Sequence, residues 1–309
     1  MTVALKVDVD TYRGTLEGVP ALLRLFDEYQ VRATFLFSLG PDHTGRALRR
    51  IFRPGFLQKV RRTSVASNYG LKTLMYGVLL PGPHIGRKAG DVMRSVAEAG
   101  HEVGIHCYDH VRWQDYVAHK DEQWTRRELD LAAETFQEVF GHAATTHGAA
   151  GWQLNAHTLK WEEEAGLKYA SDVRGKSAFY PVLQGIESKC SQIPTTLPTL
   201  DELIGRDGIT EENVHEYIYA ESQYILPNGH VYTLHAELEG MQLLSTMEKL
   251  LVMWKGFEGT VQAVGDTYDS LDLSSLPKHQ IGWGELEGRS GYLAMQSIAV
   301  EKQVSQQPV

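Results

Sequence analysis

Short apolar runs alternate along the chain with longer segments in which apolar residues recur at helical spacing. Residues 5–9 are predicted to form a buried strand, and residues 16–29, with Leu22, Leu23 and Phe26 on one face, the helix that follows. The same reasoning predicts strands at 31–39, 102–106, 144–148, 169–173, 192–197, 230–235 and 259–264. It predicts helices at 89–99, 122–140, 155–165, 211–224 and 241–254.

Alternation of strands and helices favours a parallel sheet in an α/β fold, and seven or eight such units close most simply into a (β/α) barrel. A chain of 309 residues is long enough for one barrel. We therefore expect residues 1–300 to form a single domain and residues 301–309 to form a frayed tail.

The connection after the second predicted strand departs from this pattern. Residues 43–90 contain ten Lys and Arg and no Asp or Glu, which gives this segment a net charge of +10. Because the whole chain has a net charge of −9, the rest of it carries −19. Bulky apolar residues such as Phe52, Phe56 and Leu79 are interleaved with the basic ones. This composition favours a basic amphipathic insertion that rests on an anionic bilayer. The alternative is a basic excursion that packs on the barrel or binds another anionic partner.

The composition of the whole chain limits which classes of partner it can bind and indicates the compartment in which it works. An acidic chain is a poor candidate for binding nucleic acid over its whole surface. The two cysteines, Cys107 and Cys190, make no disulfide framework, and no secretory leader is readable, so we expect an intracellular protein. The longest weakly polar stretch, residues 71–83, is far shorter than the ~20 residues of a membrane span, so no transmembrane helix is expected.

Asp8 and Asp10 are the first candidates for chemistry. They lie two residues apart at the end of the first strand, so both side chains emerge on one face, near the mouth of a barrel. Two carboxylates in that position need a cation or a proton. The alternative is a surface turn in which Asp10 caps the next helix.

His106 and His110 follow the strand at 102–106, and their spacing of four places both imidazoles on one side of a helical turn. Alone this spacing is a weak signal, because the chain has 13 histidines. Together with an aspartate from another strand end, the pair would bind one divalent metal ion and leave positions open for water and substrate. Zn²⁺, Mn²⁺ and Co²⁺ all suit this set.

His235 ends the strand at 230–235 and is a candidate general acid. Asp172 and Arg174 alternate at another strand end, and a carboxylate beside a histidine favours the imidazolium that protonates a leaving amine. Taken one at a time, each of these residues is equally well explained by a salt bridge at a strand end.

Together these residues resemble a known family. Asp8-x-Asp10, then residues 100–106 with His110, then Leu234-His235, are similar in order to the motifs of the polysaccharide deacetylases, the NodB-homology or carbohydrate esterase 4 family. The resemblance implies a distorted barrel that hydrolyses N-acyl groups on sugars with one divalent metal. It further implies metal ligation by Asp10, His106 and His110, with Asp8 as catalytic base and His235 as acid.

The sequence departs from the family pattern at two points. Val9 separates two aspartates that are usually adjacent, and residues 146–152 lack the arginine that normally orients the base. Arg174 and Arg13 are the candidates for that role. Arg13 is also assigned to substrate binding, and strand-end position alone makes Ser38, Asp42, Gly151 and Trp152 further substrate contacts.

Additional motifs resemble one branch of the family. These motifs lie at residues 7–20, 38–42, 149–152, 171–175, 197–202 and 235–240. The resemblance implies removal of a formyl group from a 4-deoxy-4-formamido-L-arabinose carried by undecaprenyl phosphate, at the cytoplasmic face of the bacterial inner membrane. It implies a place in lipid A modification and polymyxin resistance. The alternatives are an N-deacetylase of a soluble amide and a metal-dependent glycan or lipid-headgroup binder that does not turn over.

Overall fold

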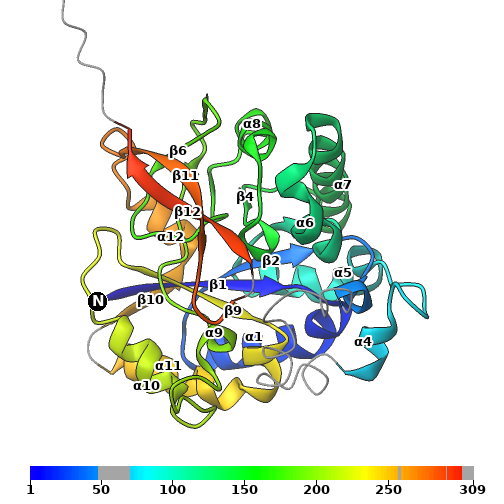
Figure 1. Cartoon of the computed structure of the whole chain (residues 1–309). Helices are drawn as coiled ribbons and strands as arrows, with labels where there is room; N and C mark the ends of the chain where they lie inside the picture. Colours follow the sequence, from blue (N-terminus) through cyan, green and yellow to red (C-terminus); the bar gives the residue numbers. More distant parts are fainter. Residues whose placement is uncertain (48–69, 257–258, 290, 301–309) are drawn as a thin grey trace, which may run out of the picture.

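A parallel sheet of eight strands forms the centre of the part of the chain that the structure, a computed structural model, describes: residues 1–47, 70–256, 259–289 and 291–300 (Figure 1). The strands are β1 (Thr2–Val9), β2 (Thr34–Ser38), β3 (Glu102–Cys107), β4 (Thr146–His147), β5 (Tyr169–Ala170), β8 (Ser191–Gln192), β9 (His230–His235) and β10 (Thr260–Ala263).

Strand β1 lies in the middle of the sheet. Residues 3–5 of β1 pair with β9 and β10 at once, and residues 6–8 pair with β9 and β2, so β9 occupies one edge while β10 and β2 share the other. The sheet continues from β2 through β3, β4 and β5 to β8. Beyond β8 the ring is joined to β9 by the backbone N–H groups of Thr196 and Leu197, which donate to the carbonyl of Val231 at 3.1 and 3.2 Å. The predicted distorted barrel is confirmed.

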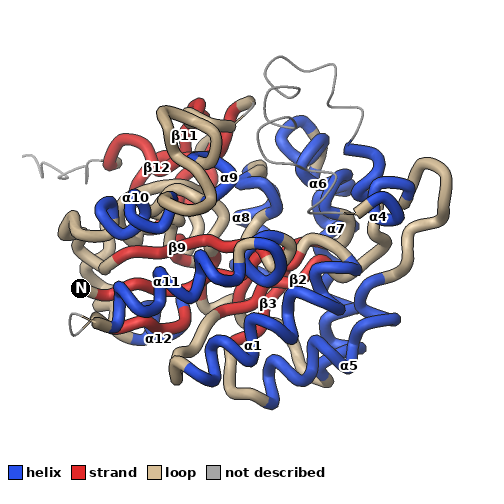
Figure 2. The backbone as a smooth tube through the Cα atoms, turned by 90° about the horizontal axis from the view of Figure 1, so that it is seen from below, coloured by secondary structure: helices blue, strands red, loops and turns tan. Residues whose placement is uncertain are grey.

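Helices cover the outside of the sheet (Figure 2). The α-helices of the described residues are α1 (Val19–Glu28), α4 (Leu71–Met75), α5 (Ile85–Glu98), α6 (His110–Tyr116), α7 (Glu122–Phe140), α8 (Ala156–Glu164), α9 (Leu200–Leu203), α10 (Val214–Glu221), α11 (Leu244–Lys255) and α12 (Val264–Asp269). Helix α7 has the predicted bounds because both ends are signalled locally. Asp121 caps its first turn by accepting from Trp124 N, and Gly141 ends it with φ +78°.

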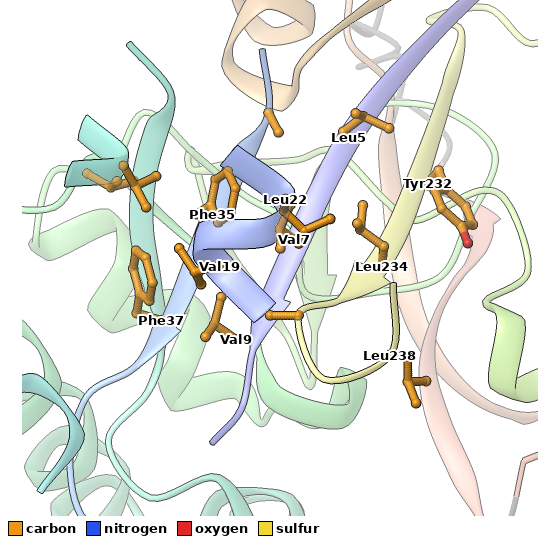
Figure 3. Close-up of a cluster of buried hydrophobic side chains, with 14 of the residues drawn as sticks. Leu5, Val7, Val9, Val19, Leu22, Phe35, Phe37, Tyr232, Leu234 and Leu238 are labelled. Atoms are coloured by element: carbon orange, nitrogen blue, oxygen red, sulfur yellow. The ribbon is translucent and has the colours of Figure 1, made fainter. Parts of the chain in front are cut away.

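The core lies between the sheet and these helices. Leu5, Val7 and Val9 of β1 point into it together with Leu22 of α1 and Phe35 of β2 (Figure 3). Because successive side chains of a strand point to opposite faces, the even-numbered residues of β1 face the interior of the barrel. The apolar alternation in β1 thus decides which side chains reach the site described below.

A second sheet was not predicted. Strands β6 (Tyr180–Leu183), β7 (Ile186–Glu187), β11 (Lys278–Glu285) and β12 (Tyr292–Ala299) form it in the order β12-β11-β6-β7. The β11–β12 hairpin is antiparallel, and β12 reaches the barrel where Arg174 N donates to Ala294 O at 3.0 Å. Gly282 and Gly284 weaken the alternation of apolar and polar residues in this stretch, so the sequence pattern did not predict the hairpin.

The short helices α4, α6, α9 and α12 were not predicted either, and the strands of the barrel differ from the prediction in length. The strands predicted at 144–148, 169–173 and 192–197 are two-residue pairings, because the barrel is too distorted for longer ladders there. No helix in the described residues is long and apolar enough to span a bilayer. Residues 48–69 of the predicted insertion and the predicted tail at 301–309 lie outside the described residues.

Candidate active site

An open cleft of about 540 Å³ lies at the carboxyl ends of β1, β3 and β9. It brings together seven of the predicted site residues, which are Asp8, Asp10, His106, His110, Gly151, Trp152 and His235. Sequence reasoning missed four others that line it, which are Gln114, Asp201, Leu238 and Arg289. The carboxyl ends of parallel strands meet at one edge, so residues far apart in sequence gather there.

Asp10, His106 and His110 form the centre of the cleft. His106 Nε2 lies 3.2 Å from Asp10 Oδ1, and His110 Nε2 lies 3.4 Å from Asp10 Oδ2. One ligand atom from each of the three residues lies within 4.8 Å of the others. Asp10 Oδ1 is buried and has no hydrogen-bond partner in the described part of the chain. Two imidazole nitrogens and an orphaned carboxylate oxygen that converge in this way fit a divalent metal ion.

The tautomer of His106 supports this fit. Its Nδ1 lies 2.6 Å from the carbonyl oxygen of Gly148, a hydrogen bond that requires the proton on Nδ1 and leaves Nε2 as a lone pair toward Asp10. Burial raises the pKa of Asp10, but the neighbouring imidazoles of His110, His106 and His235 lower it more, so the net pKa lies below its ordinary value. Asp10 is therefore anionic, as a carboxylate that holds a metal ion must be.

Asp8 lies beside this set on the same face of β1. Its Oδ1 is 3.8 Å from His106 Nδ1 and is buried with no hydrogen-bond partner among the described residues. A carboxylate oxygen that is held out of water without a donor is ready to accept a proton from a bound molecule.

Lys6, which sequence reasoning missed, lies under Asp8. Its side chain is fully buried, and its Nζ donates to Ser171 O at 2.9 Å and lies 3.7 Å from Asp8 Oδ2. Burial lowers the pKa of Lys6, and the charges of Asp8 and Asp172 oppose that shift. The cation beside Asp8 is thus a lysine two residues away on the same strand face. The period of two in β1 was the signal that could have found it.

His235 faces the cleft from the end of β9, directly across from Asp8 in the strand register. Its backbone N–H donates to Glu239 Oε2 at 2.9 Å, and Tyr232 OH donates to Glu239 Oε1 at 2.9 Å. Its Nδ1 is buried and has no hydrogen-bond partner in the described ranges. Glu239 therefore fixes the end of the strand and leaves the imidazole to the cleft.

Glu237 holds the turn that carries Asp10. Its Oε1 accepts from Asp10 N at 3.1 Å and from Thr11 N at 2.8 Å. A Cβ on Gly14 would lie 1.9 Å from the same oxygen, so only glycine fits there. The motif at residues 235–240 thus supplies the imidazole and two buried glutamates that orient its surroundings.

Asp172 and Arg174 lie behind the cleft wall. Asp172 Oδ1 accepts from Ala149 N at 2.8 Å and lies 3.1 Å from His147 Nδ1, while Gln192 donates to Oδ2. Among the described residues, Asp172 makes no contact with His235 and Arg174 makes none with Asp8. Arg174 instead donates to Glu202 Oε1 at 2.8 Å and to Leu197 O at 2.9 Å.

Three predicted substrate contacts do not line the cleft. Ser38 is buried with its Oγ 3.2 Å from Cys107 Sγ. Asp42 accepts from Tyr12 N and Thr44 N at 3.0 Å each and so stabilises the turn after β2. Arg13 forms an ion pair with Glu17 at 3.0 Å. Their predicted contact with substrate stays a prediction.

Gly151 and Trp152 do line the cleft, and both residues have a left-handed backbone conformation. Their φ angles are +64° and +52°, and a Cβ on Gly151 would lie 2.5 Å from the Gln114 side chain. This turn places the Trp152 ring against three cations. The ring centroid lies 4.3 Å from the Arg289 guanidinium, 5.0 Å from that of Arg174 and 5.5 Å from Lys6 Nζ.

Comparison with known proteins agrees with this architecture. A family model described as polysaccharide deacetylase matches residues 2–170. A relative from Shewanella sediminis, named probable 4-deoxy-4-formamido-L-arabinose-phosphoundecaprenol deformylase ArnD, is 38% identical over 98% of this chain and 97% of its own. A relative of the same name from Wigglesworthia glossinidia brevipalpis is 30% identical over 93% of this chain and 100% of its own. A solved Mycobacterium smegmatis structure, provisionally described as a polysaccharide deacetylase, covers 92% of this chain and 94% of its own at 20% identity and a TM-score of 0.62.

The chain belongs to the polysaccharide deacetylase family. Within that family it is most usefully compared with the two relatives named as ArnD deformylases, which it matches over nearly their full length. The family and these names define a hydrolase that acts on an amide bond. The Mycobacterium smegmatis structure confirms the NodB-like fold.

Proposed function

We propose that this protein removes the formyl group from 4-deoxy-4-formamido-L-arabinose linked to undecaprenyl phosphate, releasing formate and the free amine. The observation that carries the proposal is the convergence of an orphaned carboxylate, a metal-type triad and an imidazole in one cleft. The names of two relatives, matched over more than 90% of this chain, supply the substrate. The product amine would serve lipid A modification and polymyxin resistance.

Asp10, His106 and His110 would hold one divalent metal ion in this proposal. Such an ion lowers the pKa of a water molecule and polarises the amide oxygen. Asp8 accepts the proton of the water that attacks the formyl carbon, because its Oδ1 has no other donor among the described residues. His235 donates a proton to the sugar nitrogen as the C–N bond breaks. Water and formamide are consumed, and formate and amine are produced.

Four further residues, of which only Asp172 and Arg174 were predicted from the sequence, support these groups indirectly. Lys6 orients Asp8, and Glu239 fixes the strand end that carries His235. Asp172 holds the backbone at Ala149, one residue from the carbonyl that orients His106. Arg174 acts through the Trp152 ring on which it stacks.

Because the proposed substrate is lipid-linked, we propose that the enzyme rests on the cytoplasmic face of the inner membrane. The described ends of the basic insertion, residues 43–47 and 70–90, lie at the carboxyl end of β2, where Asp42 N donates to Pro83 O at 2.9 Å, so these ends are at the cleft end of the barrel (Figure 1). In its described part Val78 and Leu79 are 56% and 76% exposed. Exposed apolar residues beside Lys and Arg suit a bilayer surface.

Mass spectrometry of the formamido-arabinose phosphopolyprenol after incubation with the protein tests the reaction. We expect a loss of one formyl group per sugar and equimolar formate, with both abolished by a chelator. Unchanged substrate would remove the deformylase assignment. Formate release that persists after complete demetallation would remove the metal from it.

Co-sedimentation with anionic vesicles tests the membrane part. We expect the double substitution Val78→Asp with Leu79→Asp to lower binding to the vesicles severalfold, because two charges replace apolar side chains that would insert into the bilayer. Ile225→Asp is the matched control, since Ile225 is 99% exposed in the loop before β9, at the opposite end of that strand from His235. Equal sedimentation of both variants would exclude the turn as a membrane contact.

A further inference from the structure

The wall of the cleft opposite the metal-type triad carries a second pair of polar residues, Asp201 and Arg289. Asp201 lies in α9, and Arg289 lies in the turn between β11 and β12. Neither belongs to the chemistry described above. The unpredicted second sheet therefore contributes a side chain directly to the site.

Arg289 is placed firmly. The φ of Gly288 is +88°, and a Cβ there would lie 2.1 Å from Glu202 O, so the tip of the hairpin packs backbone to backbone against α9. The guanidinium lies over the Trp152 ring, and its Nε is 3.5 Å from Glu202 Oε1. Such stacking holds the planar group in one orientation before any ligand arrives.

One nitrogen of this guanidinium has no hydrogen-bond partner among the described residues. The Arg289 side chain is only 10% exposed, and its Nη1 is buried without an acceptor in the described part of the chain. A buried donor without a partner is costly, which is typical of groups that bind a ligand. Its Nη2 lies 4.0 Å from Asp201 Oδ2, so a carboxylate acceptor stands beside the unfilled donor.

The charges of this wall select the class of ligand. Arg174 and Arg289 face Asp201 and Glu202, so the four groups are balanced. A phosphate placed here would gain no net attraction and would meet the Asp201 carboxylate. A hydroxyl group can accept from Arg289 and donate to Asp201 at once.

We propose that Asp201 and Arg289 form a subsite that binds a ring hydroxyl of the pentose and so determine sugar specificity. The identity of the sugar rests on the proposed function. 4-Deoxy-4-formamido-arabinose has hydroxyls at C2 and C3, and the subsite takes one of them. The pair acts on recognition of the sugar and takes no part in proton transfer.

The test is a double-mutant cycle in which one change is a substitution in the enzyme and the other is removal of a hydroxyl group from the substrate. We compare kcat/KM of the wild type and Arg289→Met on the parent lipid-linked sugar and on its 2-deoxy and 3-deoxy analogues. Arg289→Met should lower kcat/KM about 10- to 100-fold on the parent, the range of a hydrogen bond to a charged group. On one deoxy analogue it should have almost no effect, because the contact is already absent. An equal loss on all three substrates, or none on the parent, would overturn the subsite.

Arg206→Met is the matched control. Arg206 pairs with Glu287 of the same hairpin and does not line the cleft, so its loss weakens the hairpin without touching the subsite. Its effect should be the same on all three substrates. Asp201→Asn, which keeps an acceptor oxygen, should lose less than Arg289→Met and show the same dependence on the analogue.

A binding measurement separates this inference from the deformylase reaction. Calorimetry with the amino-pentose phosphate headgroup, which cannot be deformylated, should show binding to the wild type that weakens at least about tenfold in Arg289→Met. Equal binding overturns the subsite even if formate is released from the full substrate. Arginine-dependent binding without any formate release overturns the deformylase assignment and keeps the hydroxyl subsite.

Discussion

Two clusters in this protein are built from the same kinds of residue. Asp10, His106 and His110 form one, and His147, Glu162 and Asp172 form the other. In each, ligand-type atoms of all three residues lie within 4.8 Å of one another. The first borders the open cleft, whereas all three side chains of the second have zero exposure.

Hydrogen bonding separates the clusters further. His147 Nδ1 lies 2.7 Å from Glu162 Oε1 and 3.1 Å from Asp172 Oδ1, so the donor points into its own cluster. Burial lowers the pKa of His147, but the charges of Asp172 and Glu162 raise it to about 10. In the cleft, by contrast, His106 donates away from the cluster and leaves its lone pair for a ligand. By the direction of the imidazole donors and the access of solvent, the first cluster is suited to chemistry and the second to stability.

The two clusters are also connected through three consecutive residues. His147 belongs to the buried cluster, the carbonyl of Gly148 accepts from His106, and Ala149 N donates to Asp172. The buried cluster thus holds the backbone that orients a ligand of the open one. Gly148 itself has no room for a side chain, since a Cβ would lie 2.3 Å from Leu36 and 3.1 Å from Lys6.

The strongest contrast is expected from Asp10→Ala. Loss of the carboxylate between the two imidazoles should lower the metal content to background. It should also lower kcat/KM by about 10⁴-fold, since a catalytic metal ion lowers the activation barrier by several kcal/mol. Metal analysis and formate release measure both. Thermal stability should change little. A variant that keeps its metal and activity would show that this cluster is not the metal centre.

In the buried cluster, His147→Gln should act on stability instead. Removing the imidazolium leaves two buried carboxyl groups without their neighbouring cation, which costs about 3–5 kcal/mol in the free energy of unfolding. Urea denaturation measures that loss, and metal content per folded molecule should stay near that of the wild type. Loss of metal without loss of stability would reverse the roles assigned to the two clusters.

Lys6→Met tests the connection between the site and the core. The substitution removes the cation beside Asp8, so we expect kcat to fall about 10- to 100-fold, as for other groups that orient a catalytic side chain. Stability should be unchanged or higher, because a buried lysine whose burial lowers its pKa is replaced by an apolar side chain of similar length. A drop in stability with normal kcat would make Lys6 purely structural.

The smallest effect is a pH dependence of stability. The pKa of His147 in the folded protein is raised from 6.5 to about 10, so its stabilising contribution is fully present below pH 6.5 and is lost as the pH rises toward 10. The difference in unfolding free energy between the wild type and His147→Gln should therefore shrink over that interval. A difference that stays constant from pH 6.5 to 10 would mean that His147 is not charged in the folded protein.

Much of the fold could be predicted because its signals are local. Helix α7 has a cap, a period and a terminal glycine, and its predicted bounds are those observed. The two-residue strands β4, β5 and β8 have too few residues for a period, so their predicted lengths were wrong. The second sheet was missed because its strands come from two distant stretches of the chain and are weakened by glycines.

The sequence by itself determined which side chains share a strand face and which chemistry they offer. Asp8 and Asp10 lie together because a strand repeats every two residues, and His106 and His110 because a strand end meets a helix start. Only the tertiary structure decided that Asp172 serves the buried cluster and that a distant hairpin delivers Arg289. Such choices depend on which strand ends meet and how deeply each group is buried, and neither is encoded in the spacing of nearby residues.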